Sequence, residues 1–288
     1  MIYIGQTKII TELEIAIAIS FKEKKVLPHI LLYGERGYGK TFLATYIAEK
    51  IGSNITVANG GNISKMFVWK VLAEIGEGDV IFIDEIHSIP ISTAEELYLP
   101  MQNFKMRIGS IDPFSLSIKK FTLIGATTEA GEIPKPLFDR FVYHFIMDTY
   151  SIEELADIIK LHSTKKIEKD LLQKIAFIAQ GNPRTGINYL KRIENLSEGK
   201  IVKTKSLEKF IELSGIDEYG LIPLQRKYLT FLKTSAASVG KNVISNVLGL
   251  PESYIQNNIE PFLLKQGWIS RTKTGRIITK KGLELQIK

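Results

Sequence analysis

The sequence of 288 residues contains no cysteine. Disulfide bonds, thiolate metal sites and cysteine nucleophiles are therefore excluded. The sequence also lacks an apolar run long enough to span a membrane, and its best candidate, residues 13–21, is interrupted by Glu14. No basic region followed by an apolar stretch opens the chain, so no signal peptide is evident. These absences predict a soluble, cytoplasmic protein.

The overall composition is that of a globular protein, with 44% hydrophobic and 24% charged residues. The length is sufficient for two or three domains. A formal net charge of +7 favours an anionic partner such as nucleic acid. A lysine-rich composition without functional meaning is the alternative, so charge alone does not identify DNA.

One stretch combines a strand pattern, a glycine-rich loop and a helix pattern. Residues 30–32 form an apolar run that predicts a buried parallel strand, and residues 41–50 have apolar side chains at helical spacing. Between them, residues 34–41 read G-x-x-x-x-G-K-T. This is the context that a phosphate-binding P-loop requires, which favours it over a chance glycine-rich turn.

The residue types in this loop suit nucleotide phosphates. Glycines let backbone N–H groups turn towards phosphate oxygens without a Cβ clash, and the helix N-terminus adds partial positive charge. A lysine can reach the β- and γ-phosphates and a threonine hydroxyl can ligate Mg²⁺. The sequence therefore predicts ATP and Mg²⁺ as cofactors, bound by Gly37, Gly39, Lys40, Thr41 and Phe42.

A second apolar run, residues 80–83, ends in two carboxylates, Asp84 and Glu85. This pattern is typical of a buried parallel strand that ends at a nucleotide site. We expect Asp84 to hold Mg²⁺ and Glu85 to activate the attacking water as general base. A solvated pair of carboxylates is the alternative, and the adjacent His87 is expected to be a packing residue.

Periodicity and turn residues predict most of the remaining elements. A capped helix is expected to begin at Ser151, with Glu153 and Glu154 in its first turn. Other helices are expected at 8–25, 63–75, 92–106, 168–180, 186–196, 205–214, 223–234, 240–248 and 251–266, strands at 54–58 and 121–128, and hairpins within 107–120 and 267–278. The fold class is an α/β P-loop domain with a parallel sheet at 1–150, a helical lid at 151–216 and a winged helix at 217–288.

The order of motifs resembles that of AAA+ ATPases. The P-loop and Asp-Glu-Ile-His at 84–87 are followed by Phe-Thr-Leu-Ile-Gly-Ala-Thr-Thr at 121–128, Leu-Phe-Asp-Arg-Phe at 137–141 and Gly-Asn-Pro-Arg at 181–184. The resemblance implies that Thr128 senses the γ-phosphate and that Arg140 completes a neighbouring subunit's site. It also implies nucleotide contacts from Tyr3, Ile4, Tyr150, Pro183 and Arg184, the last acting in catalysis. A surface arginine and a capping threonine are the ordinary alternatives for Arg140 and Thr128.

The C-terminal hairpin carries a basic turn. Arg271 and Arg276 flank a tight turn that contains Lys273. Three helices followed by such a hairpin predict a winged helix, and a basic wing suits contacts with DNA phosphates. Winged helices also bind proteins, so a protein-binding role for this wing remains an alternative.

Over almost its whole length the chain is similar to the RuvB family, the motors of bacterial Holliday-junction branch migration. The similarity implies a homo-hexamer that couples ATP hydrolysis to translocation of duplex DNA and works with a RuvA-like junction-binding protein. Departures from the family pattern include Glu35, Arg36 and Tyr38 in the P-loop, Phe138, Glu129 and a shorter 107–120 hairpin. An AAA+ loader and a non-hydrolysing, ATP-gated DNA-binding protein remain as alternatives.

Overall fold

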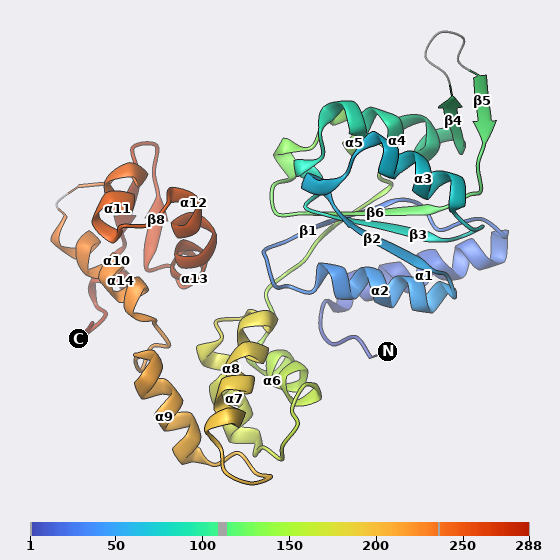
Figure 1. Ribbon diagram of the computed structural model, residues 1–288. Coiled ribbons are helices and arrows are strands. Elements are labelled where there is room, and N and C mark those ends of the chain that lie inside the picture. The colour runs from blue at the N-terminus through green and yellow to red at the C-terminus, as the bar shows by residue number, and fades with distance from the viewer. Residues whose placement is uncertain (1, 109–113, 236, 288) are drawn as a thin grey trace. The chain divides into compact units, whose positions relative to one another are not determined.

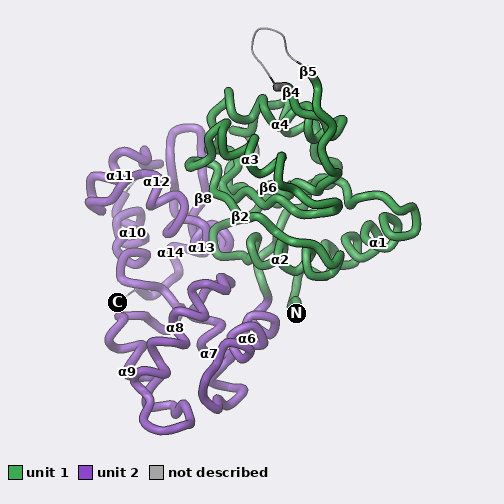
Figure 2. Tube along the Cα trace, turned by 45° about the vertical axis from the view of Figure 1, so that its right-hand side comes forward, with its two compact units in different colours: residues 1–150 green, residues 151–288 purple. Residues whose placement is uncertain are grey.

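The computed structural model describes residues 2–108, 114–235 and 237–287 (Figure 1). The chain forms two compact units, residues 1–150 and 151–288, which are coloured separately in Figure 2. The second unit contains both the expected lid and the expected winged helix. Within the described ranges, no helix has the length and apolar character needed to cross a membrane.

A parallel sheet of five strands organises the first unit. Its strand order is β2–β3–β6–β1–β7. The strands are β1 (Ile30–Tyr33), β2 (Ile55–Asn59), β3 (Val80–Asp84), β6 (Thr122–Thr127) and β7 (Tyr143–Ile146). The helices and short helical turns are α1 (Thr7–Glu23), α2 (Lys40–Ile51), η1 (Gly60–Asn62), α3 (Lys65–Glu74), η2 (Ile86–Ser88), α4 (Ile91–Asn103), η3 (Ala130–Glu132) and α5 (Lys135–Phe138).

Helices cover both faces of this sheet, as Figure 1 shows. Alternate strand residues such as Leu32 and Phe82 pack with α1 and α2 on one face. Their neighbours Leu31 and Ile81 pack with α3 and α4 on the other. Burial on both faces explains why the central strands are continuous apolar runs rather than alternating patterns.

The segment after α4 differs from the prediction. The helix expected at 92–106 ends at Asn103, because Phe104 adopts a left-handed conformation with φ 52°. The chain then enters β4 (Lys105–Ile108), which pairs antiparallel with β5 (Phe114–Ser117). The hairpin predicted within 107–120 is present, but its first strand begins at Lys105, inside the range predicted as helix, and its central residues 109–113 lie outside the described residues.

The second unit begins with four helices. These are α6 (Ile152–Leu161), α7 (Lys169–Ile178), α8 (Pro183–Leu196) and α9 (Thr204–Ser214). The capping box predicted at Ser151 is confirmed: its hydroxyl accepts a hydrogen bond from the Glu154 N–H at 3.1 Å, and the Glu154 carboxylate accepts one from the Ser151 N–H at 2.9 Å.

A winged helix completes the second unit. It comprises α10 (Pro223–Thr234), α11 (Lys241–Leu248), α12 (Glu252–Tyr254), the π-helical turn η4 (Ile255–Ile259), α13 (Glu260–Lys265), β8 (Ile269–Arg271), β9 (Arg276–Ile278) and α14 (Lys280–Leu283). The single helix expected at 251–266 is thus interrupted. Pro261 has no N–H to donate to the preceding turn, which disfavours a regular α-helix here.

Two glutamine side chains join the helical segment to the winged helix. The Gln180 amide N–H groups donate to Gln225 Oε1 at 2.8 Å and to the Gly220 carbonyl at 2.7 Å. The Gln225 amide donates back to Gln180 Oε1 at 2.9 Å. Gln225 is buried, and Gln180 lies in the turn before α8 with φ 57°. This reciprocal pair satisfies the buried amide of Gln225 and links two parts of the second unit.

A buried histidine ties the sheet to α4. The Leu123 N–H donates to His29 Nδ1 at 2.9 Å, so Nε2 carries the proton and donates to the Met101 carbonyl at 2.9 Å. His29 is therefore neutral in the folded protein. Burial lowers the pKa of His29, outweighing the hydrogen bond to Met101.

We expect this histidine to make the stability of the first unit depend on pH. Because the pKa of His29 is lower in the folded than in the unfolded protein, its contribution to stability is fully present above the unfolded-state pKa of about 6.5. That contribution is lost as the pH falls. Between pH 7.5 and 5.5, the free energy of unfolding in denaturant should fall by up to about 1 kcal/mol. A His29→Asn variant should lack this component, whereas His162→Asn, an exposed control, should retain it. Equal pH dependence in all three proteins would contradict the assignment.

Candidate nucleotide site and nucleic-acid interface

The glycine-rich loop connects β1 to α2 at the carboxyl edge of the sheet. Gly37 and Gly39 have φ values of 86° and 90°, in the left-handed region that glycine adopts without a Cβ penalty. Lys40 is the first residue of α2 and is buried; its Nζ donates to the carbonyls of Gly34 at 2.7 Å and Glu35 at 3.1 Å. The start of a helix at this loop provides backbone N–H donors for an anion.

Thr41 and Phe42 follow in the first turn of α2, and both are exposed. A hydroxyl at this position is an oxygen donor of the kind that Mg²⁺ prefers. The second predicted metal ligand, Asp84, is the last residue of β3. Its carboxylate accepts a hydrogen bond from the Glu85 N–H at 3.0 Å. The donor set therefore fits the chemistry of a Mg²⁺-nucleotide.

Glu85 has an unusual backbone conformation for a residue with a side chain. Its φ is 49°, in the left-handed region, and such positions cost of order 1–3 kcal/mol. The neighbouring backbone is tightly approached: a Cβ on Gly60 would lie 2.3 Å from the Glu85 carbonyl oxygen. Only glycine fits at residue 60, because any side chain there would collide with the backbone of Glu85.

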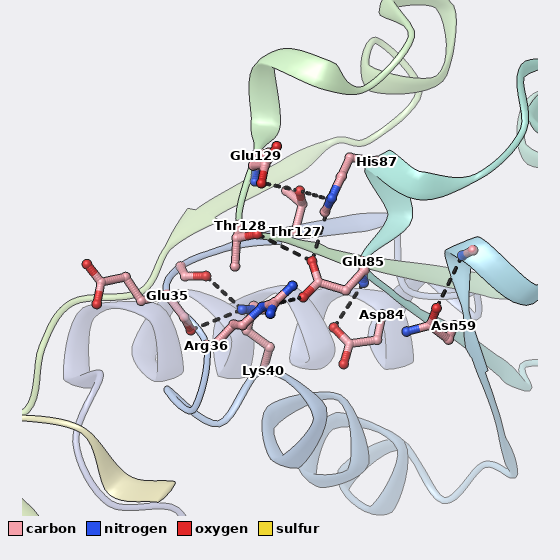
Figure 3. A network of polar contacts seen from close by, with 12 residues as sticks. Glu35, Arg36, Lys40, Asn59, Asp84, Glu85, His87, Thr127, Thr128 and Glu129 are labelled. Carbon is pink, nitrogen blue, oxygen red and sulfur yellow. Dashed lines mark hydrogen bonds and ion pairs between the residues drawn. The ribbon is translucent and has the colours of Figure 1, made fainter. Parts of the chain in front are cut away.

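The Glu85 carboxylate lies at the centre of a polar network (Figure 3). Its Oε1 accepts a hydrogen bond from Arg36 Nε at 3.2 Å. Its Oε2 accepts one from Thr128 Oγ1 at 3.3 Å and lies 3.5 Å from His87 Nδ1. The P-loop, the end of β3 and the end of β6 therefore meet at one carboxylate, whose side chain is 18% exposed.

Sequence patterns did not indicate two members of this network. His87, expected only to pack, has its Nδ1 2.9 Å from Thr127 Oγ1, which also accepts a hydrogen bond from the Glu129 N–H at 2.8 Å. Arg36 departs from the family pattern, and no sequence pattern predicts its contact with Glu85. Both contacts join residues at least 40 positions apart, and no local pattern reports such pairs.

Aromatic residues surround the start of α2. The Tyr3 ring centroid lies 5.6 Å from that of Phe42 and 5.5 Å from that of Tyr46. The Tyr3 hydroxyl is 3.3 Å from the Tyr150 hydroxyl, which donates to the Tyr38 carbonyl at 2.9 Å. Burial, and then the proximity of Tyr150, raise the pKa of Tyr3, so its hydroxyl stays protonated. Tyr3, Phe42 and Tyr150, which are predicted to contact the nucleotide, thus lie together. Ile4, the residue after Tyr3, is half-buried.

Arg140 is held by its own chain. Its guanidinium donates to the Tyr98 carbonyl at 2.9 Å, to Gln102 Oε1 at 3.3 Å and to the Pro136 carbonyl, and it lies 4.7 Å from the Tyr98 ring centroid. These contacts anchor the arginine to α4 and α5. Its expected action on a neighbouring subunit stays a prediction.

The predicted lid residues lie at the start of α8 in the second unit. Asn182 caps this helix by accepting a hydrogen bond from the Thr185 N–H at 3.2 Å. Pro183 is buried, and Arg184 is exposed in the first turn. Their contact with nucleotide stays a prediction.

A buried carboxylate holds the wing. Glu260 is fully buried and accepts hydrogen bonds from Arg276 Nε at 2.7 Å, Arg271 Nη2 at 2.8 Å and the Tyr228 hydroxyl at 3.1 Å. Burial alone would raise the pKa of Glu260, but hydrogen bonds and charges from Arg276 and Arg271 outweigh it and lower the pKa. The Glu260 hydrogen bond in turn raises the pKa of Arg276.

The two predicted DNA contacts therefore differ in exposure. The Arg271 side chain is 50% exposed, whereas that of Arg276 is 11% exposed and packed against Glu260. Most of the Arg276 side chain is buried because its guanidinium pairs with Glu260, and its predicted contact with DNA stays a prediction. Lys273, at the tip of the turn, is exposed.

The features above occur in the order found in AAA+ ATPases that carry a C-terminal winged helix, and this is the class that the fold and the site define. A model of the Holliday junction DNA helicase RuvB P-loop domain matches residues 1–147, and one of the RuvB C-terminal winged helix domain matches residues 218–286. The chain belongs to the RuvB family.

Named relatives and solved structures agree with this assignment. The Holliday junction branch migration complex subunit RuvB of Campylobacter hominis is 38% identical, over 98% of this chain and 87% of its own length. The Thermosipho melanesiensis subunit of the same name is also 38% identical, over 97% and 94%. The structure of the Thermotoga maritima RuvB Holliday junction branch migration motor has a TM-score of 0.84 and 33% identity, over 97% of this chain and 93% of that one.

Removing the carboxylate of Glu260 should destabilise the winged helix. A Glu260→Gln variant leaves two guanidinium groups, one of them buried, without a counter-charge, which costs about 3–5 kcal/mol. Unfolding in denaturant can be followed by the fluorescence of Trp268 in a Trp69→Phe background. Because the folded-state pKa of Glu260 is lowered, its contribution is present at neutral pH and is lost only as the pH falls below about 4. Glu284→Gln, an exposed control, should be neutral; an equal effect of both variants would contradict the network's role.

Proposed function

We propose that this chain is an ATP-driven DNA motor that moves Holliday junctions by branch migration, the activity after which its relatives are named. The observation that carries the proposal is the position of Glu85. Its carboxylate lies within hydrogen-bond distance of the P-loop side chain Arg36 and of Thr128 at the end of β6. A candidate base that contacts both elements is well placed to act on a terminal phosphate.

The nucleotide would be held by elements at the carboxyl edge of the sheet. Backbone N–H groups around Gly37 and Gly39, together with Lys40, would bind the phosphates. Thr41 and Asp84 would hold Mg²⁺, which neutralises charge on the phosphates when bound. The adenine would lie beside Tyr3, Ile4, Phe42 and Tyr150, with Pro183 and Arg184 contributed by the lid.

In hydrolysis, Glu85 would orient and deprotonate the attacking water, and Thr128 would help to position it. Arg140 would stabilise charge on the γ-phosphate of a neighbouring subunit in a homo-hexamer, after leaving its present contacts with α4. Arg184 would contact the γ-phosphate in cis.

On the DNA side, the wing would contact backbone phosphates through Arg271 and Lys273. Arg276 would act by positioning the wing through Glu260, since most of its side chain is buried. A RuvA-like junction-binding protein is part of the proposal as a partner. With DNA as the substrate, we propose a cytoplasmic location.

A synthetic four-way junction tests the motor activity directly. In the presence of ATP and Mg²⁺, with or without added RuvA, the wild-type chain should convert the labelled junction into its two duplex products. Glu85→Gln should retain ATP binding but lose at least about 10²-fold in turnover and in junction conversion, because water activation is removed and the phosphate ligands remain. Hydrolysis without junction movement would favour the loader alternative, and hydrolysis by Glu85→Gln would remove Glu85 as the base.

The wing's contribution to DNA binding can be read from salt dependence. Lys273→Ala and Arg271→Ala should each make the slope of log K against log salt shallower by about one, because each removes one phosphate contact. Affinity for duplex DNA can be measured by fluorescence anisotropy at several salt concentrations. Lys209→Ala, which alters an exposed lysine on α9, is the matched control and should leave the slope unchanged. Unchanged slopes for both wing variants would assign the wing to protein binding.

A further inference from the structure

A charged side chain of the P-loop contacts the candidate base. Arg36 lies between Gly34 and Gly37 in the loop, and its Nε donates to Glu85 Oε1 at 3.2 Å across 49 residues of sequence. The Arg36 side chain is 63% exposed, while that of Glu85 is only 18% exposed. The guanidinium therefore reaches from the phosphate-binding loop to the end of β3, as Figure 3 shows.

We propose that Arg36 is a γ-phosphate-sensing residue: it pairs with Glu85 and exchanges that carboxylate for the γ-phosphate when ATP binds. The inference rests on the proposed role of Glu85 as the base. Arg36 would then make the site prefer ATP over ADP. Release of the base would be coupled to binding of the phosphate on which the base acts.

The charges at the loop support this exchange. A guanidinium forms its strongest hydrogen bonds with carboxylate and phosphate oxygens, and its planar fork suits both. The P-loop lysine reaches the β- and γ-phosphates. The Nζ of this lysine, Lys40, is hydrogen-bonded at 3.1 Å to the carbonyl of Glu35, the residue before Arg36. The Arg36 side chain therefore starts from the part of the loop that would face the terminal phosphate.

The Glu85 side of the pair can also give up the contact. The Arg36 end of this ion pair is exposed, and solvent there screens the charges and weakens the pair. After release of Arg36, Glu85 keeps the hydrogen bond from Thr128 Oγ1 at 3.3 Å and the nearby His87. The carboxylate therefore remains on the side of the site from which it would act on water.

Nucleotide affinity, measured without turnover, tests the exchange. Full-length wild type, Arg36→Gln, Glu85→Gln and the double variant are titrated calorimetrically with ADP and with a non-hydrolysable ATP analogue, both with Mg²⁺. Arg36→Gln should weaken binding of the analogue by about three- to tenfold, the size expected for one partly exposed charged contact, and should leave ADP binding unchanged. Glutamine keeps a polar side chain of similar reach, and denaturant unfolding confirms that the variant is folded.

The double variant isolates the contact between the two side chains. Glu85→Gln should strengthen binding of the analogue in the wild-type background, because a neutral amide holds Arg36 less firmly. That gain should be at least halved in the Arg36→Gln background. Lys50→Ala, an exposed charge at the other end of α2, is the matched control and should change neither affinity.

Two results would overturn the proposal. Equal weakening of ADP and analogue binding by Arg36→Gln would mean that the arginine supports the loop rather than sensing the γ-phosphate. Independent, additive effects of the two substitutions would mean that the contact does not couple them. Both are distinct from a failure of the proposed function, which would appear as ATP hydrolysis by Glu85→Gln or as a wild-type chain that leaves ATP intact.

Discussion

The parallel pairing of β6 between β1 and β3 is the constraint on which the first unit depends. Tyr33 is level with Thr127 in one ladder, and Ile83 is level with Gly125 in the other. Three chain segments consequently leave the sheet at the same edge. A slip of one residue would turn every side chain of the slipped strand to the opposite face and separate Glu85 from Thr128. The register of the ladders therefore determines the chemistry of the site.

Local patterns accounted for the elements whose identity is written in consecutive residues. The P-loop, the Asp84–Glu85 strand end and the Ser151 capping box each depend on a few adjacent side chains, and the structure contains all three elements. Local patterns failed where tertiary structure, rather than the neighbouring residues, determined the local conformation. Strand β7 was not predicted because it is a short edge strand of four residues, one of them the polar His144. The end of α4 at Asn103 was missed because the next residue, Phe104, adopts a left-handed conformation without being glycine.

Charged side chains were predicted least well, since their roles depend on partners elsewhere in the chain. Arg271 and Arg276 are similar in sequence context and both pair with Glu260, yet the Arg271 side chain is 50% exposed and the Arg276 side chain is 11% exposed. Arg36 and Glu85 lie on different segments, and only the fold brings them together. A count of basic residues on the wing overstates the charge that DNA would meet, because one carboxylate neutralises part of it.

One contact between the helical segment and the winged helix is made of uncharged groups. Gln180 and Gln225 exchange amide hydrogen bonds, and neither side chain titrates or carries a net charge. Ionic strength and acidity, which alter every contact between the wing and a polyanion, leave this connection unaltered. In this protein a contact with nucleic acid can therefore be weakened by electrolyte while this amide pair is kept.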